Sequence, residues 1–350
     1  MELNNIVTWL RENDATRLTE LWREADAARG RFVGDAVHLR GLVEFSNHCV
    51  RRCGYCGLRA PNQKISRYRL SAEDILSCAR HAASVGYGTV VLQSGEDPGI
   101  GKDWLSGVIR AIKGETPLAV TLSVGERSRE ELAAWRDAGA DRYLLRFESS
   151  NRSLYDHIHP PRPNQDHSDR LEILGILREL DYEVGSGVMI GIPGQTYEDL
   201  ARDVKLFAEL NLDMIGSGPY VSHPDTPLGG AGQDAADGGR EQVPASELMT
   251  YKVFALARLA CPRANIPSTT ALATLNPRNG HELALMRGAN VVMPNLTPER
   301  HRTSYEIYPD KAAIYEQVAR SDSPLRQRIA ALGRHVGTGR GDSPRYIGHG

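Results

Sequence analysis

The chain has 350 residues, a formal net charge of −2, 41% hydrophobic residues and 25% charged residues. These are the proportions of an ordinary globular protein, and the near-neutral charge and few aromatic residues argue against nucleic-acid binding. No run of 18 apolar residues predicts a membrane span, and the N-terminal residues lack the pattern of a signal peptide. Three of the five cysteines fall within eight positions, which indicates a metal site in a reducing compartment. We therefore expect a cytoplasmic metalloprotein with no membrane or nucleic-acid partner.

Apolar, β-branched runs recur along the chain, and most are followed by a helical pattern. Residues 1–35 are predicted to be helical and to close the bottom of the fold. The expected strands then follow in order: His38–Phe45, Thr89–Gln93, Leu118–Val124, Arg142–Phe147, Gly185–Ile192, Met214–Tyr220, Asn265–Leu272 and Asn290–Met293. Helices are expected to open at Ser71, Ser128 and Thr196, the first with an acidic residue three positions on, as in a capping box.

This alternation of strands and helices predicts the α/β class and a complete (βα)8 TIM barrel over residues 36–310. Residues 1–35 form its N-terminal helical cap, and residues 311–350 form a C-terminal helical extension and tail. The Gly-rich tail from residue 337 onward is expected to be loosely ordered. An open, doubly wound sheet with an appended helical domain is the alternative.

The strongest motif is the C-x3-C-x2-C run formed by Cys49, Cys53 and Cys56, directly after the first predicted strand. In a barrel this loop lies at the C-terminal face, where active sites are built. Three close thiolates can hold three irons of a [4Fe–4S] cluster and leave the fourth iron open. Structural zinc is disfavoured because it needs a fourth ligand. Cys78 and Cys261 are isolated on predicted helices and are expected to be small buried hydrophobes.

The fourth predicted strand carries three charged residues. Arg142, Arg146 and Glu148 differ by even steps, so they are expected to share one strand face. Charges that face the interior of a barrel need partners. We therefore expect these three residues to pair with one another or to bind a polar ligand.

The cysteine motif resembles that of the radical S-adenosylmethionine (SAM) superfamily, in which the open iron binds SAM. Two further segments agree with the resemblance, QSGEDP after the second strand and GIPGQT after the fifth. The resemblance implies a [4Fe–4S] cluster on the three cysteines and SAM beside it. It also implies that the cofactor is contacted by Ser94, Gly95, Glu96, Ser123, Arg146, Glu148, Arg170, Met189 and Ile192.

From about Leu39 to Pro309 the chain is similar, in order, to the HydE family of [FeFe]-hydrogenase maturases. The matching segments include EFSNHCVRRCGYCGLR, ADRYLLRFE, HPDTPL, IPSTTA and ANVVMPNLTP. The resemblance implies that a 5′-deoxyadenosyl radical attacks the sulfur of a cysteine-bound Fe(CO)2(CN) unit. It places a small organometallic or amino-acid-like substrate against Gln93, Thr121, Arg142, Thr269, Thr270, Met293, Tyr305 and Tyr308. Other hydrogenase maturases and a reductant protein are the implied transient partners.

The chain departs from the family pattern in two places. Ala313, Ser321 and Pro324 stand where some relatives carry a second cysteine triad, so one cluster is expected. Phe147 stands where the family often has histidine. A methylornithine synthase-like lysine mutase remains an alternative. A non-enzymatic iron–sulfur scaffold fits the cysteines but not the SAM segments, and biotin synthase would need further cysteines on barrel strands.

Overall fold

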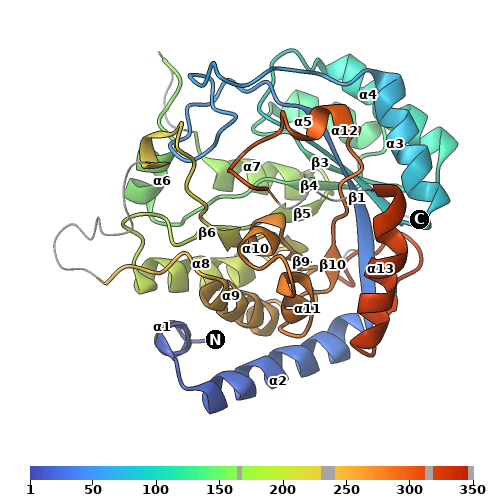
Figure 1. Ribbon diagram of the computed structural model, residues 1–350. Coiled ribbons are helices and arrows are strands. Elements are labelled where there is room, and N and C mark those ends of the chain that lie inside the picture. Colours follow the sequence, from blue (N-terminus) through green and yellow to red (C-terminus); the bar gives the residue numbers. More distant parts are fainter. Residues whose placement is uncertain (164–167, 230–240, 312–317, 346–350) are drawn as a thin grey trace.

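The structure, a computed structural model, describes residues 1–163, 168–229, 241–311 and 318–345 (Figure 1). Within these ranges, nine strands form one sheet, in which eight parallel strands follow the order β7-β5-β4-β3-β2-β1-β10-β9 and a ninth, β11 (His335–Val336), pairs with β1. The strands are β1 (Ala36–Ser46), β2 (Thr89–Ser94), β3 (Ala119–Ser123), β4 (Arg142–Leu144), β5 (Glu183–Ser186), β7 (Met214–Ile215), β9 (Pro267–Ser268) and β10 (Val291–Val292).

The sheet closes on itself between its two outer strands, β7 and β9. Asn265, just before β9, forms a parallel bridge with Met214. The amide of Ile215 donates to the carbonyl of Asn265 at 2.9 Å, and the amide of Asn265 donates to that of Asp213 at 2.8 Å. The predicted (βα)8 barrel is therefore confirmed. Two short strands, β6 (Met189–Ile190) and β8 (Gly218–Pro219), pair with each other after β5 and β7.

Helices surround the barrel and are capped largely as predicted. They are α3 (Ala72–Ser84), α4 (Lys102–Glu115), α5 (Arg129–Asp137), α6 (Arg152–Ile158), α7 (Arg170–Glu179), α8 (Tyr197–Glu209), α9 (Glu247–Ala260), α10 (Thr270–Leu275), α11 (Gly280–Leu285), α12 (Glu299–Arg302) and α13 (Val318–Ala331). Ser71, Ser128 and Thr196 each form a capping box, in which the cap side chain and an acid three residues on satisfy each other's backbone amides. In the part of the chain that is described, no helix has the length and apolarity needed to span a membrane.

Alternate residues of each strand face either the helices or the barrel interior. Val43, Leu92 and Leu122 are buried in the main hydrophobic core, whereas their neighbours Glu44 and Gln93 line a central cavity. This two-residue period is that of a pleated strand. It places the functional side chains inside the barrel and the aliphatic ones under the helices.

The seventh predicted strand, Asn265–Leu272, is wrong in its second half. β9 ends at Ser268, Thr269 takes the N-cap position with extended backbone, and α10 begins at Thr270. The Ala- and Leu-rich residues that follow have good helix propensity, which outweighs the β-branched start of the segment.

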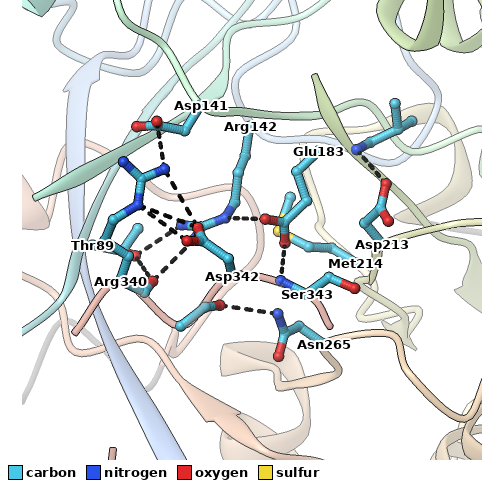
Figure 2. A network of polar contacts seen from close by, with 12 residues as sticks. Thr89, Asp141, Arg142, Glu183, Asp213, Met214, Asn265, Arg340, Asp342 and Ser343 are labelled. Atoms are coloured by element: carbon cyan, nitrogen blue, oxygen red, sulfur yellow. Dashed lines mark hydrogen bonds and ion pairs between the residues drawn. The ribbon is translucent and has the colours of Figure 1, made fainter. Parts of the chain in front are cut away.

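The tail from residue 337 was predicted to be loosely ordered, but residues 337–345 pack at the lower end of the barrel, where the strands begin. Figure 2 shows Arg340, Asp342 and Ser343 in this packing, and residues 346–350 lie outside the described residues. β11 (His335–Val336) first pairs with the start of β1. The Thr89 hydroxyl then donates to the Arg340 carbonyl at 2.8 Å, and the Ser343 amide donates to Glu183 at 3.2 Å. A Cβ on Gly88 would lie 1.6 Å from the Gly339 carbonyl, so this packing leaves no room for a side chain.

The N-terminal segment forms α1 (Leu3–Arg11) and α2 (Ala15–Val33). These helices pack against α8 and α9 (Figure 1). That residues 1–35 close the bottom of the barrel stays a prediction, whereas Arg340 and Ser343 of the C-terminal tail contact Thr89 and Glu183 there.

Candidate active site

The cysteine loop follows β1 and is anchored by three separate parts of the chain. The Val50 amide donates to the Glu96 carbonyl at 2.9 Å, the Gly54 amide to Ile158 at 2.8 Å, and the Gly57 amide to Ile307 at 3.0 Å. These bonds fix the backbone on either side of Cys53 and Cys56. The loop therefore has a defined shape at the C-terminal end of the barrel, as the sequence predicted.

Gly95 explains how the turn after β2 reaches the cysteines. A Cβ at this position would lie 2.3 Å from the His48 carbonyl oxygen and 2.8 Å from the Cys49 Cβ. Real Cβ atoms do not approach this closely, so only glycine allows the turn to press against the cysteine loop. The close approach brings Ser94 and Glu96 to the edge of the loop.

The environment of the three thiols fits an iron–sulfur cluster. Burial raises the pKa of Cys49 and of Cys56, and it raises the pKa of Cys53 to about 12. The neutral thiols are therefore favoured in the absence of a cation, and bound iron would supply the positive charge that stabilises the thiolates of Cys49, Cys53 and Cys56. Among the described residues no three His, Cys, Asp or Glu side chains are arranged to hold a single ion.

A network of charges joins the cysteine loop to α7 and β4. Arg51 lies 2.6 Å from Glu126, and Arg170 approaches the same carboxylate at 2.8 Å. The amide of Glu126 donates to the Glu96 side chain at 3.0 Å. Burial raises the pKa of Glu96, an effect that the nearby Arg51 opposes.

Arg146 and Glu148 form the other half of this network. Their side chains pair at 2.9 Å, and the Arg146 carbonyl accepts from Arg170 at 2.6 Å. Glu148 has φ +64°, a left-handed conformation that is uncommon outside glycine. Together with Glu96, these residues bring the predicted cofactor contacts next to the cysteines.

Sequence reasoning missed Arg51 and Glu126 as members of this network. Both had a detectable signal: Arg51 lies inside the cysteine motif, and Glu126 ends the TLSVGE segment after the third predicted strand.

A central cavity of about 310 Å³ lies inside the barrel next to Cys56. Residues of both predicted sets line it. The cofactor set contributes Ser94, Ser123, Arg146, Glu148, Arg170 and Met189. The substrate set contributes Gln93, Thr269, Thr270, Met293 and Tyr308. Ile192 lies behind Met189, in a small apolar cluster that also contacts Tyr55 of the cysteine loop.

The Thr269 hydroxyl is a buried polar group in the wall of the cavity. Its oxygen is shielded from solvent and has no hydrogen-bond partner among the described residues. A buried polar atom without a partner is costly, and a ligand in the cavity would satisfy it.

Three predicted substrate residues do not line the cavity. Arg142 is the clearest correction: it pairs with Glu183 at the lower end of the barrel (Figure 2). Thr121 is its β3 neighbour in the sheet, and its buried hydroxyl also has no partner among the described residues. Tyr305 lies behind the wall, where its hydroxyl accepts from the amide of Gln93 at 3.3 Å.

Arg142, Arg146 and Glu148 were expected to meet on one strand face, but β4 ends at Leu144. Arg146 and Glu148 pair with each other at the cavity, whereas Arg142 lies below it. Phe147 faces the hydrophobic core, with its ring centroid 5.9 Å from that of Phe207. The side chain at this position is therefore directed away from the cavity.

The other cysteine predictions concern positions outside the cysteine loop. Cys78 and Cys261 are buried, on α3 and at the end of α9, as expected. Of the positions that correspond to the second triad, Ala313 and the side chain of Ser321 lie outside the described residues, and Pro324 lies within α13.

Comparison with known proteins identifies the family of the chain. The Radical SAM superfamily pattern matches residues 43–207. The chain is 43% identical over 325 residues to the [FeFe] hydrogenase maturase subunit HydE of Thermotoga maritima, covering 93% of this chain and 89% of the relative. It is 26% identical over 298 residues to 3-methylornithine synthase of Methanosarcina barkeri, covering 85% and 80% of the two chains.

Two solved structures share the fold. The crystal structure of methylornithine synthase (PylB) has a TM-score of 0.77 at 23% identity, covering 96% of this chain and 94% of the other. The maturase HydG of Carboxydothermus hydrogenoformans has a TM-score of 0.76 at 19% identity, covering 95% and 75%. The extent and identity of the match to the Thermotoga relative, with the cysteine loop and its SAM-type surroundings, show that the chain belongs to the HydE family of radical SAM enzymes, which use a [4Fe–4S] cluster and SAM.

Proposed function

We propose that this protein matures [FeFe]-hydrogenase by directing a 5′-deoxyadenosyl radical at the sulfur of a cysteine-bound Fe(CO)2(CN) substrate. The observation that carries the proposal is the shared cavity, in which six of the nine expected cofactor residues and five of the eight expected substrate residues face one space beside Cys56. The 43% identity to a HydE maturase over nearly the whole chain supports the same function.

In this proposal, the residues near the cysteines bind SAM, and the residues at the other end of the cavity bind the substrate. When bound, the cluster and SAM supply the 5′-deoxyadenosyl radical. Near the cysteines, Arg146, Glu148 and Arg170 form charge-assisted contacts that suit the carboxylate, ribose and amino groups of SAM.

At the substrate end, Gln93, Thr269 and Thr270 offer hydrogen bonds to a small polar substrate, and Met293 offers an apolar wall. Enclosing the substrate in this way excludes water and holds the sulfur at a fixed position. Orientation of this kind accounts for much of the rate that an enzyme gains.

Complementation tests the proposal directly. A host that lacks its own HydE should regain hydrogenase activity when it receives this gene with the partner maturases. Cys53→Ala should abolish the effect, because it removes one cluster ligand. Cys78→Ala is the matched control and should still restore hydrogenase activity, because Cys78 lies outside the cysteine loop. Its thiol is buried on α3, where it donates to the Leu296 carbonyl.

A lysine mutase of the methylornithine synthase type is the second candidate, favoured by the 26% identity over 85% of the chain. Failure to restore hydrogenase activity, together with formation of methylornithine from lysine, would establish that candidate instead. We further propose that the protein acts in the cytoplasm, where it contacts the other maturases and a reductant protein transiently.

A further inference from the structure

A buried ion pair forms part of the cavity wall and has no role in the proposed chemistry so far. Glu44 on β1 is completely buried, and Lys311 is only 2% exposed. The Lys311 ammonium contacts one carboxylate oxygen of Glu44, and the other oxygen accepts from the Asn295 amide at 2.9 Å. Both charged residues line the central cavity.

The same ammonium holds Tyr305. The Lys311 nitrogen lies 4.7 Å from the centroid of the Tyr305 ring, a cation–π distance, and 3.4 Å from its backbone carbonyl oxygen. Tyr305 is itself buried and does not line the cavity. Its position is therefore set by Lys311 from one side and by the barrel wall from the other.

Tyr305 in turn orients Gln93. The Gln93 amide nitrogen donates to the Tyr305 hydroxyl at 3.3 Å, away from the cavity. The carbonyl oxygen of the same amide is then the atom left to face the cavity that Gln93 lines. Without the tyrosine hydroxyl, the Gln93 amide loses this hydrogen bond, and its orientation at the cavity wall is no longer held from that side.

Stability alone does not account for the ion pair. Taking two charges out of water is costly, and a buried pair replaced by well-packed apolar side chains of similar volume is often equally or more stable. A pair that lines a cavity and fixes its wall fits a role in orientation better than a role in folding.

We propose that Lys311 is a positioning residue for the maturase reaction: paired with Glu44, it holds Tyr305 so that Gln93 presents its carbonyl oxygen to the substrate. This inference rests on the proposed function, because it assumes that the substrate occupies this cavity. It adds the sequence-distant pair Glu44 and Lys311 to the residues that control the reaction.

The test compares Lys311→Met with Lys311→Arg and with the double variant Glu44→Gln/Lys311→Met. Each reconstituted protein is assayed for maturation of apo-hydrogenase, for 5′-deoxyadenosine formed, and for thermal unfolding. Lys311→Met should mature hydrogenase about 10- to 100-fold more slowly, because a misplacement of about 1 Å can cost about 100-fold in rate. It should still cleave SAM, so more SAM is consumed for each hydrogenase matured.

The other variants separate positioning from charge balance. Lys311→Arg keeps a cation beside Glu44 and Tyr305 and should recover part of the rate. The double variant removes both buried charges and should be well folded, yet it should remain slow because no cation holds the Tyr305 ring. Full activity of the double variant would overturn the proposal, since it would mean that the pair needs only to cancel its own charges.

A further variant tests the proposal without changing Lys311, so it does not depend on how well the lysine variants fold. Tyr305→Phe keeps the ring over Lys311 and removes only the hydroxyl that accepts from Gln93, so it should also be slow and uncoupled. Wild-type behaviour of this variant would refute the proposal.

The matched control is Lys252→Met, another buried lysine, which donates to the Leu10 carbonyl at 2.8 Å and does not line the cavity. It should lower thermal stability and leave maturation unchanged. If the wild-type protein matures no hydrogenase, the proposed function itself fails. If the wild type and all variants are equally active, only the inference about Lys311 fails.

Discussion

Arg142 and Glu183 face each other across the adjacent strands β4 and β5, with the guanidinium Nε 2.8 Å from the carboxylate and neither side chain exposed to solvent. Asp342 of the tail contacts the same arginine (Figure 2). A second buried arginine, Arg40, donates to the Gly341 carbonyl at 3.0 Å. The tail thus supplies a carboxylate to Arg142 and a backbone carbonyl to Arg40.

Asp342→Ala should destabilise the protein for this reason. Arg142 would keep Glu183, but the interior would lose the charge that balances its second arginine. We expect the free energy of unfolding to fall by about 1–3 kcal/mol, as for other buried groups that lose a partner. Denaturant unfolding measures the change, and the exposed Asp137→Ala is the control. Equal stability of the two variants would contradict the role assigned to the tail.

Asp203 should make stability depend on pH. Burial raises the pKa of this carboxyl to about 7, although it accepts from the Ser150 amide at 2.6 Å. Between about pH 4 and pH 7 the folded protein holds a proton that the unfolded chain releases. Protonated Asp203 therefore makes its full contribution to the free energy of unfolding below about pH 4, and this contribution is lost as the pH rises through 7.

Asp203→Asn should remove this dependence, because the amide keeps an acceptor oxygen and carries no charge. The variant should be more stable than the wild type at pH 8 and similar to it at pH 4, with a difference of about 1.4 kcal/mol for each pKa unit as the upper bound. Unfolding curves at the two pH values measure it. Identical pH profiles would show that Asp203 is not protonated in the folded state.

Gly95→Ala should impair assembly of the cluster. The added Cβ would overlap the His48 carbonyl oxygen and crowd Cys49, so the cysteine loop would have to shift. We expect a folded protein with reduced iron and sulfide after anaerobic reconstitution. Gly107→Ala is the matched control: it lies on α4 with open space around it, and it should raise stability by about 0.5–1 kcal/mol. Full iron loading of Gly95→Ala would disprove the steric argument.

Arg146→Ala should weaken SAM binding more than it weakens folding. A hydrogen bond to a charged group contributes about 1.5–3 kcal/mol, which corresponds to about a tenfold to hundredfold loss of affinity. Anaerobic calorimetric titration with SAM measures it. The control is Arg152→Ala, an exposed arginine on α6 that pairs with Asp156. If SAM affinity is unchanged, Arg146 does not contact the cofactor.

Each chain should hold one cluster with about four irons. Outside the cysteine loop the sequence has only Cys78 and Cys261, and both are buried on separate helices. Two thiols cannot supply the three or four ligands of a second [4Fe–4S] cluster. Iron and sulfide analysis with spectroscopy checks the number. Close to eight irons in well-defined clusters would contradict it.

The barrel and the cysteine loop could be predicted because their signals are local. Strand periodicity, the capping boxes and the C-x3-C-x2-C spacing each depend on residues a few positions apart. The residues around the cavity followed from the loops at the ends of successive strands. Gln93, Ser94 and Ser123 are examples: each lies in the last two residues of a strand and lines the cavity.

Arg142 shows what the pattern could not give. Even spacing assigns a side chain to a face of a strand but not to a depth along the barrel, which depends on the register with neighbouring strands. Arg142 pairs in register with Thr121 on one side and Glu183 on the other, below the residues that line the cavity.

The contacts of Asp342 and Lys311 were hidden for a different reason. Asp342 meets Arg142 across 200 positions, and Lys311 meets Glu44 across 267. A Gly-rich composition indicated freedom in the tail, whereas those glycines allow it to approach β1 and β2 closely. A Cβ on Gly341, for example, would lie 2.7 Å from the His38 ring.

The insertion of the tail also bears on how the protein is made. Strands β1 to β5 leave the ribosome long before Asp342 and Ser343, which bind β4 and β5. A nascent chain that has already grouped these strands still carries Arg40 and Arg142 without their tail partners. Completion of the barrel is therefore a late event in biosynthesis, and the incomplete barrel is the stage at which a chaperone would be of most use.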